Sequence, residues 1–236
     1  MKLAMYLSLA LLVGIQAASN QPAPAPADSS RGGMFRFRAH TPDPASRRER
    51  LARHKDYARH FSAVSASEAE RGGTRGIVQR EDWMLRLPAL PLQMSNHVLI
   101  GRIDRVRGFA ASGNNDEITG VYTEYDLDVE RWLTGHMRSQ TVTASRPGGV
   151  VRLPSGREIV FRIQGQGQLA AGKRYLLFLV PNTNSDSLRI LTGYEIRTGD
   201  LVSPVDGRDG AAVQFSKYDG VNLSDLLREI AAPAGP

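Results

Sequence analysis

The feature that most constrains the fold is a regular alternation of side chains between Glu117 and Gly135. Apolar or β-branched residues fill every second position, and polar residues, mostly acidic, fill the positions between them. Because successive side chains of a strand point to opposite faces of a sheet, this period of two predicts a β-strand with one apolar and one acidic face. The apolar face comprises Val121, Thr123, Tyr125, Leu127 and Val129, and the other face comprises Tyr122, Glu124, Asp126, Asp128 and Glu130.

Shorter segments of β character surround this strand and are separated by residues that favour turns. They cover residues 97–109, 140–145, 150–163, 174–180, 188–196 and 201–205. The segment 150–163 predicts a hairpin around Pro154-Ser155-Gly156, and Gly101 predicts a bulge in the first strand. Residues 174–180 show no polar alternation, which predicts a strand buried on both faces.

Helical patterns occur only outside this β region. Ser46 and Glu49 form a capping box, and an apolar stripe at helical spacing follows it, so we expect a basic amphipathic helix that continues to about Glu70. Asn222 or Ser224 is expected to cap a short C-terminal helix. The fold class is therefore mainly β: an OB-like antiparallel barrel or sandwich of about six to seven strands, with an N-terminal amphipathic helix and a short C-terminal helix.

The first residues have the form of a secretory signal, with Lys2 before an apolar run and small residues ahead of Asn20. No other stretch is apolar enough over a sufficient length to span a bilayer. We expect a signal peptide (1–19), a disordered Pro/Ala-rich linker (20–44), the basic helix (45–71), an apolar connector lying as a strap over the body (72–96), the barrel core (97–219), and the C-terminal helix with its tail (220–236). The chain has no cysteine, which excludes disulfides and thiolate chemistry and favours a bacterial protein that is periplasmic or extracellular.

The positive charge is concentrated in one segment. Residues 31–60 contain nine basic and three acidic residues, net +6, whereas the chain from Phe61 onward contains 20 of each. A nucleic-acid-binding body would carry its own basic face, so we expect no specific nucleic-acid partner. Two interpretations of the helix stay open: its apolar stripe docks on the body with the basic face in water, or it binds an anionic membrane, an envelope polymer or an acidic protein. The expected partner-binding residues are Arg47, Arg48, Arg50, Arg53 and Arg59.

The acidic face of the long strand is the sharpest chemical feature. Glu124, Asp126, Asp128 and Glu130 lie about 7 Å apart in succession, a spacing at which neighbours repel by only ~0.6 kcal/mol in water. Burial without cations would be prohibitive, so we expect this face to be solvated or matched by arginines of flanking strands. The candidate arginines are Arg102, Arg105, Arg107, Arg152, Arg157 and Arg162. The alternative is a calcium site or an acid–base pair on this face.

No other pattern points to catalysis. Two loops, Asn114–Glu117 and the pair Asp206 and Asp209, carry oxygen ligands but lack EF-hand spacing, so polar turns are the simpler interpretation. The chain contains no G-x-S-x-G, H-E-x-x-H or P-loop motif. We therefore expect no cofactor and no metal.

The order of motifs between His97 and Val180 resembles a known type of domain. The segments are VLIGRIDRVR, VYTEYDLDVERWLTG, VTASRPGG and GQGQLAAGKRYLLFL. Together they resemble exported bacterial proteins of unknown activity with an OB-like barrel of the netrin or tissue-inhibitor-of-metalloprotease type. The zinc-chelating N-terminal cysteine of such inhibitors has no counterpart in this cysteine-free chain. The resemblance therefore implies a fold and transfers no active residues.

These observations lead to one main hypothesis and two alternatives. The main hypothesis is an exported, non-enzymatic β-barrel binding protein of the bacterial cell envelope. Its partner would be a protein or an anionic envelope polymer, and the basic helix would be the contact. The first alternative is a hydrolase or hydrolase-associated domain that uses the acidic strand face, and the second is a protease inhibitor.

Overall fold

The structure is a computed structural model, and the residues it describes all belong to the second of two units into which the chain divides, Gly32–Pro236. The described residues are 52–53, 55, 57–61, 63–72, 75–79, 85–112, 117–153, 155–182, 187–210 and 212–232. The expected signal peptide, the linker and the beginning of the basic helix lie outside these ranges.

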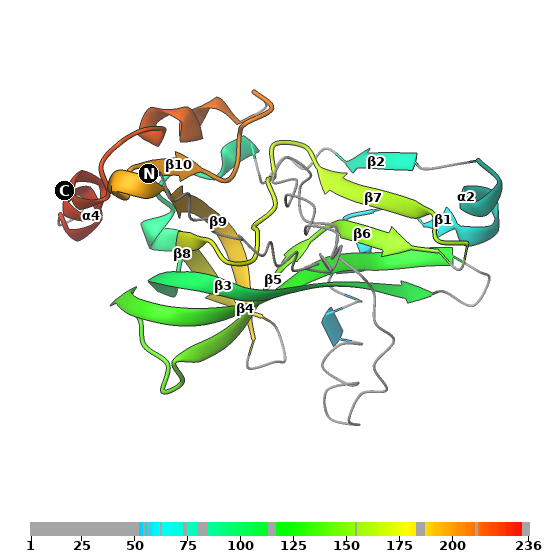
Figure 1. Ribbon diagram of the computed structural model, residues 1–236, viewed down its shortest axis with the longest axis horizontal. Helices are drawn as coiled ribbons and strands as arrows, with labels where there is room; N and C mark the ends of the chain where they lie inside the picture. The colour runs from blue at the N-terminus through cyan, green and yellow to red at the C-terminus, as the bar shows by residue number, and fades with distance from the viewer. Residues whose placement is uncertain are drawn as a thin grey trace, which may run out of the picture. The chain divides into compact units, whose positions relative to one another are not determined.

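The described residues are mainly β, as predicted, and five of their strands close into a ring, so the structure favours the barrel over the sandwich (Figure 1). Following the hydrogen-bonded neighbours, the order is β4-β3-β8-β9-β5 and back to β4. Within this ring, neighbouring strands are antiparallel except β5 and β9. That pair is parallel and joins only Ala144 to Leu188 and Ser145 to Arg189. The ring strands are β3 (His97–Ser112), β4 (Glu117–Thr134), β5 (Thr141–Pro147), β8 (Arg174–Pro181) and β9 (Leu188–Ile196).

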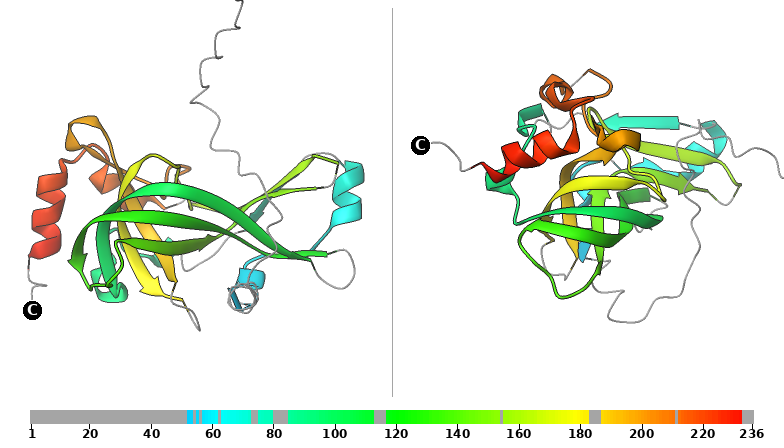
Figure 2. Two further views of the ribbon diagram at one scale, coloured as in Figure 1. Left: turned by 60° about the horizontal axis from the view of Figure 1, so that its bottom comes forward. Right: turned by 60° about the vertical axis from the view of Figure 1, so that its left-hand side comes forward.

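Shorter elements extend this ring. The first sheet continues through β1 (Val64–Ser65), which pairs with β4, and β10 (Val202–Pro204), which pairs with β9. A second sheet has the order β2-β7-β6, with β2 (Arg75–Gln79), β6 (Gly149–Arg152) and β7 (Glu158–Ile163). Besides the N-terminal helix, whose described residues lie between positions 52 and 58, the helical elements are α2 (Ala66–Gly72), η1 (Leu92–Met94), η2 (Thr198–Asp200), η3 (Val213–Tyr218) and α4 (Leu223–Ala231). Figure 2 shows α2 and α4 toward opposite ends of the long β3–β4 pair.

The core follows the predicted alternation only in part. Val121, Tyr125 and Leu127 of β4 are fully buried, as the period of two predicts, but Tyr122 and Glu124 of the opposite face are buried as well. The register of β3 against β4 shifts between Ile100 and Gly101, which confirms the predicted bulge. The hairpin of β6 with β7 and the buried strand β8 are also present where the sequence predicts them. The side chain of Asn222 accepts a hydrogen bond from the backbone of Ser224 and caps α4.

The N-terminal helical region differs from the expectation. One helix was expected to continue to about Glu70, but the helical residues from position 52 end at Ala58. Val64 and Ser65 then pair with Ile118 and Glu117 of β4 before α2 begins. Val64 and Ser65 therefore form a strand, because pairing with the edge of β4 is favoured over continuing the helix that their spacing predicts. The connector differs as well, because it contains the strand β2 in addition to an apolar strap whose Leu87 is buried.

Candidate functional site

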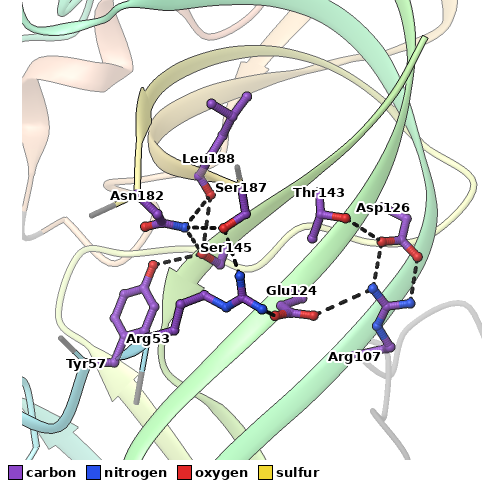
Figure 3. A network of polar contacts seen from close by, with 10 residues as sticks. All are labelled: Arg53, Tyr57, Arg107, Glu124, Asp126, Thr143, Ser145, Asn182, Ser187 and Leu188. Carbon is purple, nitrogen blue, oxygen red and sulfur yellow. Dashed lines mark hydrogen bonds and ion pairs between the residues drawn. The ribbon is translucent and has the colours of Figure 1, made fainter. Parts of the chain in front are cut away.

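A buried polar contact joins the N-terminal helix to the outer face of the barrel (Figure 3). Arg53 Nη2 forms an ion pair with Glu124 Oε1 at 2.9 Å, and Arg53 Nη1 donates a hydrogen bond to Ser187 Oγ at 2.9 Å. Arg53 is only 6% exposed and Glu124 only 5%, so the charge pair is removed from solvent. A second guanidinium, that of Arg107, lies 3.6 Å from the other carboxylate oxygen of Glu124.

Ser145 is the centre of the uncharged half of this network. Its Oγ lies 2.9 Å from Tyr57 Oη and accepts a hydrogen bond of 2.9 Å from the side-chain amide of Asn182. The same amide nitrogen donates to Ser187 Oγ at 2.9 Å and to the backbone oxygen of Leu188 at 3.0 Å. Asn182 therefore fixes the two hydroxyls that Arg53 and Tyr57 contact.

An aromatic stack lies beside the polar contacts. The Tyr57 ring is stacked on Tyr122 of β4 at a centroid distance of 5.1 Å, and Tyr122 is stacked in turn on Phe109 of β3 at 5.4 Å. Phe61, one turn after Tyr57, meets Phe161 edge to face at 5.3 Å. Arg53 and Tyr57 are four residues apart on a helix and so lie on one face of it.

The acidic face of β4 is divided between buried and exposed carboxylates. Asp126 forms two hydrogen bonds of 2.7 Å with Arg107 of the neighbouring strand, as the expected match with flanking arginines requires. Glu130 binds Arg174 of β8, whose hydrogen bonds lower the pKa of Glu130. Asp128 is exposed and accepts a long hydrogen bond of 3.4 Å from Thr141. Glu124, Asp126 and Glu130 are therefore in ion pairs with arginines, whereas Asp128 faces solvent.

The other residues named from the sequence are distributed as follows. Arg47, Arg48 and Arg50 lie outside the described residues, and Arg59 is exposed. Among the arginines expected to match the acidic face, Arg152 instead pairs with Glu158, and Arg157 donates to the backbone oxygen of Glu70. Arg102, Arg105 and Arg162 are exposed, and the first two stand opposite Asp128 and Asp126 in the β3–β4 register.

Sequence reasoning missed a second buried ion pair, between Arg146 and Asp206. Both side chains are completely buried, with Nη2 2.8 Å from Oδ2. Asp206 also accepts hydrogen bonds from the backbone of Gly167 and from Thr192 Oγ1. Arg146 has the same parity along β5 as the buried Val142 and Ala144, so the period of two was a usable signal for its inward orientation. These contacts make Asp206 a structural residue.

A depression of about 790 Å³ lies between the strap, η3 and the end of α4. Its wall is mainly apolar, with Leu90, Leu92 and Val213, and Tyr218 is a polar contribution. Tyr218 Oη donates to Glu229 at 2.5 Å, a hydrogen bond that lowers the pKa of Glu229, and burial raises the pKa of Tyr218. Tyr218, Glu229 and Lys217, which also lines the depression, are hydrogen-bonded to one another.

The chemistry available at the helix–barrel contact is recognition of a cation. The carboxylates of β4 that the figure shows are held by guanidinium groups (Figure 3). Across the part of the chain that the structure describes, no three His, Asp or Glu side chains gather in a way that could bind a metal ion. The same residues include no helix with the length and apolarity needed to cross a bilayer. Comparison with models of known protein families and with curated proteins finds no match for the chain.

Proposed function

We propose that the protein is an exported, non-enzymatic binding protein of the bacterial cell envelope, in which the OB-like barrel holds a basic helix for contact with an anionic partner. The observation that carries this proposal is the orientation of the helix. Arg53 and Tyr57 face the barrel and are buried, whereas Lys55 and Arg59 are exposed. The barrel thus holds the helix in place, and the exposed Lys55 and Arg59 can attract an anionic partner.

Export is supported by the secretory form of residues 1–19 and by the absence of cysteine. The strand order of the ring supports a barrel of the netrin or tissue-inhibitor type. The ion pairs on β4 favour binding over hydrolysis, because Asp126 and Glu130 are each engaged by an arginine. The hydrogen bonds of Arg174 lower the pKa of Glu130, so this carboxylate is stabilised in its charged form and is poorly suited to donate a proton.

The test compares two full-length variants with the same change of charge. The first replaces Arg47, Arg48, Arg50 and Arg59 by glutamine and keeps the anchor Arg53. The control replaces four exposed arginines of the barrel region by glutamine, namely Arg102, Arg105, Arg131 and Arg138. The probe is immobilised dextran sulfate at low and high salt.

The wild type and the barrel control should be retained at low salt and released at high salt, because exposed charges are screened within about 10 Å at 0.1 M. The helix variant should not be retained at low salt. Equal loss of retention in both variants would show that total charge alone determines binding, and the helix would lose its assigned role.

A further inference from the structure

The outer surface of the barrel under the N-terminal helix is a preformed cradle of polar groups. It consists of Glu124 on β4, Ser145 on β5 and Ser187 just before β9, with exposures of 5%, 0% and 8%. Asn182 orients both hydroxyls through one amide nitrogen. A cradle whose hydroxyls are fixed by a separate side chain is arranged before its occupant arrives.

The charges of this cradle select a guanidinium. Arg107 is committed to Asp126 by two hydrogen bonds of 2.7 Å and only approaches Glu124 at 3.6 Å. Arg53 therefore brings a second guanidinium to this pair of carboxylates, and its removal takes one positive charge away from the site. Arg53 uses two different nitrogens, one for Glu124 and one for Ser187. A lysine ammonium lacks this planar fork, so it cannot reproduce both bonds in the same geometry.

Stacked aromatic rings lie beside the polar groups of the cradle. Tyr122 is completely buried and lies between the rings of Tyr57 and Phe109. An occupant therefore needs a flat ring one helical turn after its arginine, as Arg53 and Tyr57 provide (Figure 3).

We propose that this face of β4 and β5 is a receptor for a helical segment of a partner protein that presents an arginine and an aromatic ring four residues apart, and that the chain's own helix occupies it in the meantime. The helix lies outside the five-strand ring, so its departure breaks no ladder hydrogen bond of the barrel. Attraction within a buried ion pair is largely offset by desolvation, so the ion pair itself adds little to the free energy that holds the helix in place. A replacement that brings a guanidinium restores the ion pair with Glu124 and the hydrogen bond to Ser187.

The test uses full-length chains and a fluorescent synthetic peptide with the sequence of residues 46–61. The double variant Arg53→Ala with Tyr57→Ala should leave the receptor open, and circular dichroism checks that the β-sheet is retained. Fluorescence anisotropy should then show binding to the open variant and binding about tenfold or more weaker to the wild type, whose own helix competes.

Matched changes distinguish the receptor from attraction by charge alone. The peptide carrying Arg53→Ala should bind the open variant about tenfold or more weakly, whereas the peptide carrying Arg59→Ala, with the same charge, should bind normally. Glu124→Gln in the open variant should abolish the preference for Arg53. Absence of binding to a folded open variant, or equal binding of the two altered peptides, would overturn the proposal.

If the double variant does not fold, the single variant Arg53→Lys tests the same proposal. Arg53→Lys retains the charge but loses one of the two bonds of the fork. Its full-length chain should bind the unaltered peptide more tightly than the wild type does. Identical affinity of the folded Arg53→Lys chain and the wild type would also contradict the proposal.

Discussion

Replacing Asp206 by asparagine should destabilise the protein severely, because it leaves the Arg146 guanidinium charged, buried and without a counter-charge. Both side chains are fully buried, and Asp206 receives hydrogen bonds from Arg146, Gly167 and Thr192. Asparagine offers one acceptor oxygen and directs an NH₂ group at these donors. Removing one partner of a buried ion pair costs ~3–5 kcal/mol, a large part of the ~5–15 kcal/mol that stabilises a typical domain.

Urea unfolding gives the measurement, since a lower midpoint with an unchanged slope reports a loss of stability. The exposed Asp200→Asn is the matched control and should change the unfolding free energy by less than about 0.5 kcal/mol. Arg146→Met combined with Asp206→Leu removes both charges together. This double variant should lose less than the sum of the two single variants by about 0.5–3 kcal/mol. A cost below about 1 kcal/mol for Asp206→Asn, or simple additivity in the double variant, would refute the reasoning.

Three further predictions concern the barrel itself. Burial raises the pKa of Tyr175 to about 12, so the neutral phenol favours the folded state. Its contribution to stability should be complete below pH 10 and be lost as the pH rises toward 12. An absorbance titration in which the Tyr175 tyrosinate forms with the ordinary tyrosine pKa of about 10 would contradict this prediction. The lowered pKa of Glu130 predicts a contribution to stability that is present above its ordinary pKa of 4.5 and is lost as the pH falls below that value. The partly exposed ion pair of Glu130 with Arg174 contributes less than about 1 kcal/mol. Arg174→Gln should remove this pH dependence from the thermal midpoint. Gly167→Ala should cost about 1–3 kcal/mol in urea unfolding, because its Cβ would lie 2.0 Å from a backbone oxygen of the neighbouring loop; an unchanged midpoint would show that the loop moves aside freely.

The barrel could be predicted from the sequence because its strands obey a local period. Alternation along β4 and the uniform apolar character of β8 identify strands whose side chains meet the core. The same reasoning placed Glu124 on a polar outer face but could not show that a helix covers it. That burial arises from a contact between residues 53 and 124, and no local pattern encodes such a contact.

The candidate site was predicted only in part for the same reason. Ser145, Asn182 and Ser187 are short polar residues with no recognisable spacing, and they meet only after the ring has closed. Arg53 was expected among the partner-binding residues because its charge indicated a surface role, whereas the structure buries it. The break before β1 was missed because Val64 continues the helical stripe, and only the edge of β4 gives it a different partner.

The parallel pairing of β5 with β9 joins just two residue pairs, so it is the shortest ladder in the ring. The residues that hold the helix stand on both sides of this seam, since Tyr57 contacts Ser145 of β5 while Arg53 contacts Ser187 next to β9. The helix thus links β5 to the start of β9 across their short parallel pairing. Amide hydrogens of the β5–β9 pairing should therefore exchange with solvent faster when the helix is undocked. Binding of a partner helix in its place should slow this exchange again.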